Sequence, residues 1–497
     1  MSFPTELVSQ NPWWRDRSAI QSDKDIVNLR KSVIQWEPRV KHFFDWTKDA
    51  VYTLRGPRQV GKTTLVKTMI SERLEKYEKK NVFYYTCNMV DNAKELVSIV
   101  TSYSDSVRVK RRRAYVFLDE VSSVKDWQKG IKHLADIGML ENVTMVLTGS
   151  HSIDVKTNSE RLPGRRGSTN DSLDKIMLPM KFVEYVESVS PKLAKEIIGP
   201  MLLPWEVRRQ VFTSLFEGEF EVMKEIVLYS KELQQLLGDY LLTGGIPRVV
   251  NEFKARDSIG EGVYKTYVDS VLGDLQRWGK RESYVRQILN RVFDTIGGPI
   301  GWNTLRKDTD IASHATVADY VDYVTDTFAM MYLHRLDINQ KSPAYEKDKK
   351  IFLEDPFFFH SLRAWCKGLE PYAASLEYLK DERNVGYLME SIVANHLVRL
   401  SFSLSKQKQL FEYKTCLFYW RSNKDREVDF VMKAGESKFF PIELKYQRTI
   451  SREDKFALID FSKATGSTAK GVLLSKNDLR GDASAVIVPA WAFLFIV

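Results

Sequence analysis

A glycine-rich segment near the start of the chain has the residue types and the spacing that bind phosphate. The apolar run VYTL leads into GPRQVGKT, a GxxxxGKT pattern that runs from Gly56 to Thr63 at the start of an expected helix. In this pattern the glycines let backbone N–H groups close around phosphates, Lys62 reaches the β and γ phosphates, and Thr63 ligates Mg²⁺. We therefore predict an ATP and Mg²⁺ site made by Gly56, Pro57, Arg58, Gln59, Val60, Gly61, Lys62, Thr63 and Thr64.

Two acidic residues end a later apolar strand. The stretch AYVFLDEV contains them as Asp119 and Glu120. Downstream of a P-loop, the first carboxylate of such a pair lies near Mg²⁺ and the second lies beside the attacking water, which favours hydrolysis of ATP over binding alone. A further strand, NVTMVLT, ends at Thr148, whose hydroxyl we expect to sense the γ-phosphate. A simple turn at the strand end is the alternative for this threonine.

Near the other end of the chain, REVDFVM and FFPIELKYQ place charged residues inside apolar strands. If these strands are neighbours, Asp429 on one and Glu443 and Lys445 on the next point to one region, because residues two apart on a strand share a face. Two carboxylates can hold Mg²⁺ or Mn²⁺, and a lysine beside them can activate a water, as phosphodiester hydrolysis requires. The alternative is a solvated hairpin with alternating charges, although an unpaired charge within an apolar strand is costly.

Periodicity indicates the elements around these strands. The amphipathic segment 384–400 predicts a helix that carries Glu390, followed by three strands. Bases that flank the strands, and that would neutralise the phosphates of DNA, are Lys424, Arg426, Lys433, Arg448 and Arg452.

The segment from about Glu282 to Asn339 has the pattern of a winged helix-turn-helix. Ser313 and Thr316 would cap a helix that reads DNA. The same helix carries Asp319 and Asp322, which phosphate would repel. A protein contact or an architectural role is therefore the alternative for this segment.

Length and composition limit the classes of protein. A chain of 497 residues is too long for a single core, so about two to four domains are expected. The net charge of +9 favours polyanionic partners, and three distant cysteines offer no zinc or disulfide spacing. The N-terminus does not have the pattern of a secretory signal. The longest apolar run, 485–497, is too short to span a bilayer and is interpreted as terminal strands, so no membrane partner is expected. The unpaired spacing of the cysteines favours a reducing cytoplasm.

The order of these motifs resembles the archaeal and bacterial AAA+ ATPases that join an ATPase module to a C-terminal domain of unknown function. The resemblance covers most of the chain from about residue 30 onward. Residues that match the family's DEV-x₅-W, GR, P-L-x-F-x-E-like and Y-L-x-x-GG-x-P signatures are Asp119, Glu120, Val121, Trp127, Gly164, Arg165, Pro179, Phe182, Glu184, Tyr240, Leu241, Gly244, Gly245 and Pro247.

This resemblance implies active sites that a neighbouring subunit completes with an arginine. The candidates are Arg161, Arg165 and Arg166, and a basic loop that only serves solubility is the alternative. Arg248 stands where the family usually has an acidic residue, and it would be a sensor within the same chain. An insertion between about residues 186 and 231 has no counterpart that we can place.

The C-terminal pattern resembles the PD-(D/E)xK, or restriction-endonuclease-like, superfamily. The resemblance implies that Asp429 and Glu443 are metal ligands, that Lys445 is the catalytic lysine and that Glu390 is the accessory acid on the helix. Val428 stands where the superfamily name has proline.

Together these observations predict an α/β multidomain fold: a P-loop AAA+ module with a helical lid, a winged-helix domain and a C-terminal restriction-endonuclease-like α/β domain. The expected limits are an extension over 1–29 and domains over 30–190, 191–275, 276–345 and 346–497. We expect a self-associating ATPase that acts on DNA through a nuclease-like module. The alternative is a regulatory or signalling ATPase whose C-terminal module is catalytically silent and binds a protein partner.

Overall fold

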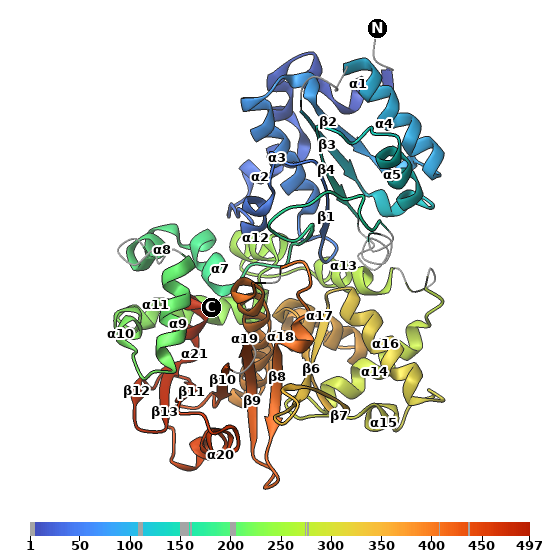
Figure 1. The fold of residues 1–497 in the computed structure, drawn as a ribbon. Coiled ribbons are helices and arrows are strands. Elements are labelled where there is room, and N and C mark those ends of the chain that lie inside the picture. Colours follow the sequence, from blue (N-terminus) through green and yellow to red (C-terminus); the bar gives the residue numbers. More distant parts are fainter. Residues whose placement is uncertain are drawn as a thin grey trace. The chain divides into compact units, whose positions relative to one another are not determined.

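The computed structural model describes residues 5–107, 113–149, 159, 162–198, 205–273, 275, 278–406, 408–435 and 438–497. The chain divides into two compact units, Met1–Leu178 (unit 1) and Pro179–Val497 (unit 2) (Figure 1). Within the described ranges, no helix has the length and apolar character needed to cross a bilayer.

Unit 1 is built on a parallel sheet of five strands in the order β2-β3-β4-β1-β5. Figure 1 shows α3 on one side of this sheet and α4 and α5 on the other. Since parallel strands place their carboxyl ends at one edge, the P-loop after β1 and the acids after β3 meet there. The elements are β1 (Ala50–Arg55), α3 (Lys62–Lys76), β2 (Val82–Thr86), α4 (Ala93–Val107), β3 (Ala114–Asp119), α5 (Trp127–Asp136), β4 (Val143–Thr148) and β5 (Asp174–Ile176).

In the N-terminal segment, α1 (Thr5–Gln10) and the residues after it cover the edge strand β2, whereas α2 (Lys24–Lys31) packs against α3. The Asn11 side chain donates to the carbonyl of Tyr84 at 2.8 Å and accepts from its N–H at 2.7 Å. The indole N–H groups of Trp13 and Trp14 both donate to the Val82 carbonyl at 3.0 Å. These contacts satisfy backbone groups that an open sheet edge would leave unpaired.

Unit 2 contains a mixed sheet of eight strands in the order β12-β13-β11-β10-β9-β8-β6-β7. The pairs β8–β9 and β9–β10 are antiparallel, whereas β10–β11 and β11–β13 are parallel. The sheet joins strands from both sides of the predicted limit at residue 345. The strands are β6 (Met330–Asp337), β7 (Ser342–Leu353), β8 (Leu417–Arg421), β9 (Glu427–Ala434), β10 (Lys438–Leu444), β11 (Gly471–Ser475), β12 (Arg480–Gly481) and β13 (Ala485–Pro489).

Helices surround this sheet, and they include the insertion that the sequence could not place. Phe212 and Phe216, on and just after α9, lie with their ring centroids 5.4 and 4.7 Å from that of Phe440 on β10. The insertion therefore packs against the C-terminal sheet. The helices are α7 (Phe182–Val189), α8 (Pro191–Ile198), α9 (Trp205–Leu215), α10 (Glu221–Val227), α11 (Ser230–Thr243), α12 (Pro247–Arg256), α13 (Glu261–Leu272), α14 (Glu282–Asp294), α15 (Trp302–Arg306), α16 (His314–Asp326), α17 (Pro356–Lys367), α18 (Pro371–Tyr378), α19 (Glu382–Leu404), α20 (Phe456–Thr465) and α21 (Ala490–Ile496).

Two predictions of local structure are confirmed and one is wrong in part. The predicted helix 384–400 lies within α19, and the Ser313 hydroxyl caps α16 by accepting from the Thr316 N–H at 3.1 Å. The terminal run 485–497 is strand only as far as Pro489, and it continues as the buried helix α21. A short apolar run that is buried on all sides has no periodicity to separate helix from strand.

The Y-L-x-x-GG-x-P signature forms a joint within unit 2. The Tyr240 hydroxyl donates to the Met180 carbonyl at 2.8 Å, and the Gly245 N–H donates to the Asp355 carboxylate at 2.8 Å. A Cβ atom on Gly244 would lie 1.9 Å from that carboxylate. Only glycine permits this approach, so the signature positions backbone rather than a reacting group.

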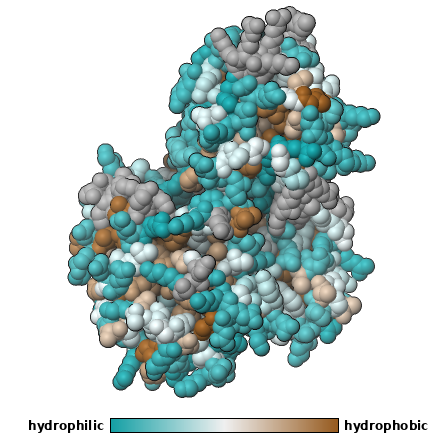
Figure 2. Space-filling view, viewed as in Figure 1, coloured by the Kyte–Doolittle hydropathy of each residue, from teal (hydrophilic) through white to brown (hydrophobic). Residues whose placement is uncertain are grey.

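The face of the molecule in Figure 2 is mostly hydrophilic. The most exposed large apolar side chains come from separate places in the chain, namely Met89, Leu228 and Leu410. Scattered single residues of this kind are normal on a protein surface.

Candidate functional site

The loop between β1 and α3 has the backbone geometry of a phosphate cradle. Gly56 and Gly61 have φ values of +151° and +105°, which L side chains rarely adopt, and Gln59 has a φ of +61°. A Cβ atom on Gly56 would lie 2.1 Å from the carbonyl oxygen of Met177. Helix α3 begins directly after this loop at Lys62, so its N–H groups and dipole favour an anion there.

Lys62 is buried and folds back over the loop. Its ammonium donates to the carbonyl oxygens of Gly56 and Pro57, both at 2.9 Å. Burial lowers the pKa of Lys62 to about 8, although the charges of Glu120 and Asp119 oppose the shift. A buried ammonium that is held by neutral carbonyl groups is a receptor for negative charge.

Asp119 accepts hydrogen bonds from three hydroxyl groups at the carboxyl edge of the sheet. Its carboxylate accepts from Thr63 at 2.9 Å, from Tyr84 at 3.1 Å and from Thr148. The predicted residues Thr63, Asp119 and Thr148 are therefore brought together. Glu120 follows with a φ of +57°, and its N–H donates to the Thr148 hydroxyl at 3.2 Å.

Tyr84, which donates to Asp119, belongs to a set of residues that was not predicted from the sequence. The Lys67 ammonium lies 3.4 Å from the centroid of the Tyr84 ring and 3.2 Å from the carboxylate of Asp23. Asp23 comes from the N-terminal segment and Tyr84 from β2, so only the fold joins them to the P-loop helix. One available signal was a lysine on the buried face of α3.

The arginines after β4 differ in their surroundings. Arg166 is held inside unit 1, because both terminal nitrogens lie 3.1 Å from the Asp174 carboxylate and its Nε donates to the Val51 carbonyl. Arg165 makes one exposed ion pair with Asp136 at 2.7 Å. Arg161 lies outside the described residues. Arg248 is exposed at the start of α12 in unit 2.

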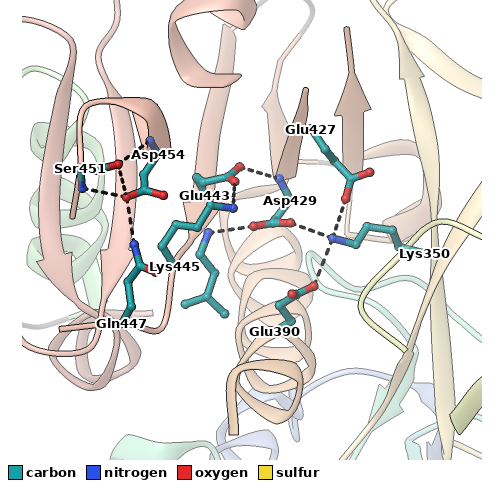
Figure 3. A network of polar contacts seen from close by, with 10 residues as sticks. Lys350, Glu390, Glu427, Asp429, Glu443, Lys445, Gln447, Ser451 and Asp454 are labelled. Carbon is teal, nitrogen blue, oxygen red and sulfur yellow. Dashed lines mark hydrogen bonds and ion pairs between the residues drawn. The ribbon is translucent and has the colours of Figure 1, made fainter. Parts of the chain in front are cut away.

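In unit 2, the predicted carboxylates and lysine also converge (Figure 3). Asp429 on β9 and Glu443 on β10 are neighbours, because the Asp429 N–H donates to the Glu443 carboxylate at 3.2 Å. The Lys445 ammonium lies 2.5 Å from Glu443. The Leu444 N–H donates to the Asp429 carboxylate at 2.9 Å.

A lysine that the sequence analysis did not consider lies at the centre of this cluster. The Lys350 ammonium, from β7, lies 2.7 Å from Asp429, 2.9 Å from Glu427 and 3.1 Å from Glu390 on α19. Burial opposes its charge, but the carboxylates of Asp429, Glu390 and Glu427 outweigh burial and raise the pKa of Lys350 well above its ordinary value.

The carboxyl groups respond unequally to burial. Burial raises the pKa of Glu443 well above its ordinary value, with the charge of Asp429 adding to the shift. Burial also raises the pKa of Glu390, to about 7, against the attraction of Lys350. Asp429 behaves in the opposite way, because Lys350 and Lys445 overcome its burial and lower its pKa. Asp429 is therefore the most firmly ionised of these three acids.

Comparisons with known proteins agree with the geometry of unit 1. Residues 48–186 match the family model described as an AAA domain. This segment is similar to AAA domains, and it is called the AAA domain below. Residues 234–369 and 385–493 match two models described as domains of unknown function, DUF8612 and DUF4143.

Two relatives that match part of the chain are distant. The uncharacterized proteins MJ1544 and MJ1637 of Methanocaldococcus jannaschii are each 23% identical, over 358 and 214 residues. The matches cover 70% and 42% of this chain, and they span 63% and 40% of those proteins.

Two solved structures share low sequence identity with the chain. The Walker-type ATPase PABY2304 of Pyrococcus abyssi is 14% identical, with 70% of this chain and 97% of that chain covered and a TM-score of 0.39. The Aeropyrum pernix Orc1 protein in complex with DNA is 13% identical, with 76% and 95% covered and a TM-score of 0.28. Neither similarity is close enough to transfer a role.

The AAA domain offers groups that fit Mg²⁺. The hydroxyl of Thr63 and the carboxylate of Asp119 lie 2.9 Å apart beside the phosphate cradle, and hard oxygen ligands of this kind suit the ion. Magnesium bound there would neutralise charge on the phosphates of ATP.

The cluster in unit 2 does not fit a divalent metal. Each carboxylate oxygen of Asp429 and Glu443 already accepts from a donor, namely Lys350, the Leu444 N–H, the Asp429 N–H or Lys445. Across the described part of the chain, no group of three His, Cys, Asp or Glu side chains is arranged to hold a metal ion. The cations that the chain itself supplies at this cluster are the ammonium groups of Lys350 and Lys445.

Proposed function

We propose that the chain hydrolyses ATP at the AAA domain. The observation that carries this proposal is the hydrogen bond of 2.9 Å between Thr63, at the start of α3, and Asp119, at the end of β3. In this proposal Lys62 exchanges its loop carbonyls for phosphate oxygens, and Glu120 orients the attacking water.

Two variants separate binding from hydrolysis. Lys62→Ala should abolish tight ATP binding, whereas Glu120→Gln should keep binding and lower kcat by about 10²- to 10⁴-fold. Binding is measured by calorimetry and turnover by phosphate release. Lys76→Ala, an exposed lysine at the other end of α3, is the matched control. Normal turnover by Glu120→Gln would reject the role of that acid.

Self-association forms part of the proposal, with Arg165 as the residue that acts on a neighbouring subunit. Its partly exposed position and single surface ion pair leave it able to change partners, whereas Arg166 is paired with Asp174. Mixing Arg165→Ala protein with Lys62→Ala protein should restore some activity if the defects lie on opposite sides of an interface. A dilute monomer with full activity would reject self-association.

The partner proposed for unit 2 is DNA. Helices α14, α15 and α16 are followed by the β6–β7 hairpin, and Ile300 bridges to Lys349 of this hairpin, which is the element order of a winged helix. The acids on α16 that would repel phosphate have cations beside them. Asp319 pairs with Lys280, and Asp322 lies 3.7 Å from Lys414.

Cleavage of that DNA is the finer prediction from the sequence. Because Lys350, Lys445 and two backbone N–H groups already donate to the oxygens of Asp429 and Glu443, we propose that this module binds DNA without cutting it. Fluorescence anisotropy with duplex DNA at low salt tests the grip. Replacing exposed Arg448 and Arg452 by alanine should weaken binding to all sequences and flatten its salt dependence, whereas Lys347→Ala should not.

The same measurement addresses the alternative. If the full chain has no affinity for DNA at low salt, DNA as the partner is rejected. The regulatory ATPase with a protein partner then takes its place, and the ATPase proposal for unit 1 is unaffected.

A further inference from the structure

The cluster in Figure 3 joins four acidic residues and two lysines from four elements of unit 2. Lys350 lies on β7, Glu427 and Asp429 lie on β9, Glu443 and Lys445 lie at the end of β10 and beyond it, and Glu390 lies on α19. Lys350 is only 1% exposed, and Asp429 and Glu443 are 6% and 2% exposed. Buried charges at such depth are retained only when they are paired.

The ammonium of Lys350 makes the contacts that a metal cation would make in a nuclease-like site. It reaches three carboxylates from two elements, at 2.7 to 3.1 Å. These are hydrogen-bond lengths, longer than the approximately 2.0–2.2 Å that oxygen ligands make to small divalent metals. A divalent ion between Asp429 and Glu390 would have to displace this ammonium.

Glu443 and Lys445 form a second pair of acid and lysine, on the other side of Asp429 from Lys350. Lys445 takes one oxygen of Glu443, and the Asp429 N–H takes the other. Lys445 has a side chain that is 36% exposed, so it lies at the rim, whereas Lys350 lies at the centre.

We propose that Lys350 is the resident cation of this cluster and replaces a divalent metal, so that unit 2 holds its acids together without metal. This inference goes beyond the proposed hydrolysis of ATP and does not depend on it. Its physical basis is that one buried positive charge, supplied by the chain itself, compensates the carboxylates that a metal would otherwise bridge.

The test uses Mn²⁺ as the probe on the nucleotide-free full chain. Electron paramagnetic resonance should detect the same amount of bound Mn²⁺ in the wild-type protein and in Asp429→Asn. Comparing these two proteins removes any contribution from the AAA domain, because that domain is the same in both. Wild-type binding of Mn²⁺ that is lost in Asp429→Asn would overturn the proposal.

A second measurement places the lysine itself under test. Lys350→Met keeps an unbranched side chain, one atom shorter, and removes its charge, so the carboxylates lose their cation. Hydrogen exchange at β9 and β10 should then slow by about tenfold or more when about 1 mM Mn²⁺ is added, and by less than about twofold in the wild type. Lys347→Met, an exposed lysine on the same strand, should behave as the wild type.

The two measurements have distinct outcomes. A folded Lys350→Met protein whose exchange ignores Mn²⁺ would overturn the proposal, because the vacated centre should then attract a cation. If Lys350→Met does not fold, the wild-type resonance experiment still decides between an ammonium and a metal. Failure of ATP hydrolysis would alter neither result, because both are made without nucleotide.

Discussion

Two buried lysines, one in each unit, show opposite ways to place a positive charge inside a protein. Lys62 is held by two backbone carbonyls, and its pKa falls to about 8 because burial is only weakly opposed. Lys350 is held by three carboxylates, and its pKa rises well above the ordinary value in spite of burial. Both side chains are nearly inaccessible, so the partners and not the depth make the difference.

The contrast indicates which lysine awaits a ligand. Neutral carbonyls compensate a buried ammonium poorly, so Lys62 gains when a polyanion arrives. Carboxylates compensate Lys350 within the chain, so a further ion has little to add and much to displace. A buried lysine between acids can therefore indicate a site whose carboxylates are already compensated within the chain and need no metal ion.

The largest expected effect comes from removing each charge in turn. Lys350→Met should lower the free energy of unfolding of unit 2 by about 3–5 kcal/mol, because it leaves buried carboxylates without a cation. Lys62→Met should change unit 1 by no more than about 1 kcal/mol, since lost hydrogen bonds are offset by relief of an uncompensated charge. Hydrogen exchange, reported separately for β9 and for α3, measures both.

Exposed lysines supply the controls for that pair. Lys347→Met on β7 and Lys76→Met on α3 should each change stability by less than about 0.5 kcal/mol. Equal destabilisation by Lys62→Met and Lys350→Met would remove the basis of the comparison.

The second prediction concerns pH and ATP. The pKa of Lys62 is about 8 in the nucleotide-free protein, and phosphate requires the charged form. Above about pH 8 the bound state therefore takes up a proton, and affinity should fall by up to about tenfold for each further pH unit. Calorimetry at about pH 7 and about pH 9.5 checks the slope. Lys62→Arg, which stays charged, should weaken the dependence, and an unchanged slope in that variant would assign the proton elsewhere.

A third prediction tests the support behind Asp119. Tyr84→Phe removes a hydroxyl that donates to this carboxylate at 3.1 Å. The hydrogen bond that holds Asp119 in place, worth about 1 kcal/mol, should then be lost. The expected sign is a higher Mg²⁺ concentration for half-maximal ATPase activity, by about fivefold. Tyr85→Phe is the control, because that hydroxyl bonds to Glu6. Equal shifts in both variants would indicate a general effect on β2.

The smallest expected effect belongs to the rim of the unit 2 cluster. Lys445→Met should cost less than about 1 kcal/mol, because this lysine is partly exposed and the raised pKa of Glu443 lets that acid take up a proton instead. Chemical denaturation of Lys445→Met and of Lys350→Met measures the two losses of stability, which are then compared. If the loss from Lys445→Met matched that from Lys350→Met, the rim and the centre of the cluster would not differ.

Local pattern was enough to locate much of both sites. The spacing from Gly56 to Thr63 fixes a loop and a helix start, and the alternation of β9 and β10 places Asp429 beside Glu443. The cap of α16 by Ser313 also depends on residues close in sequence. These features were predictable because each rests on geometry within a few residues or on two adjoining strands.

The tertiary structure alone decided which buried charges are compensated by a partner of opposite charge. Lys350 meets Asp429 across 79 positions of sequence, and Tyr84 meets Asp119 across 35, so no local period connects them. Arg166 also depends on a distant residue, because its Nε donates to the Val51 carbonyl across 115 positions. Sequence determined that this chain has a P-loop and a second set of acids with one lysine, Lys445, beside them. Long-range packing determined that Lys62 faces neutral carbonyls while Lys350 faces carboxylates, because the pKa and partners of a buried charge depend on everything that the fold brings around it.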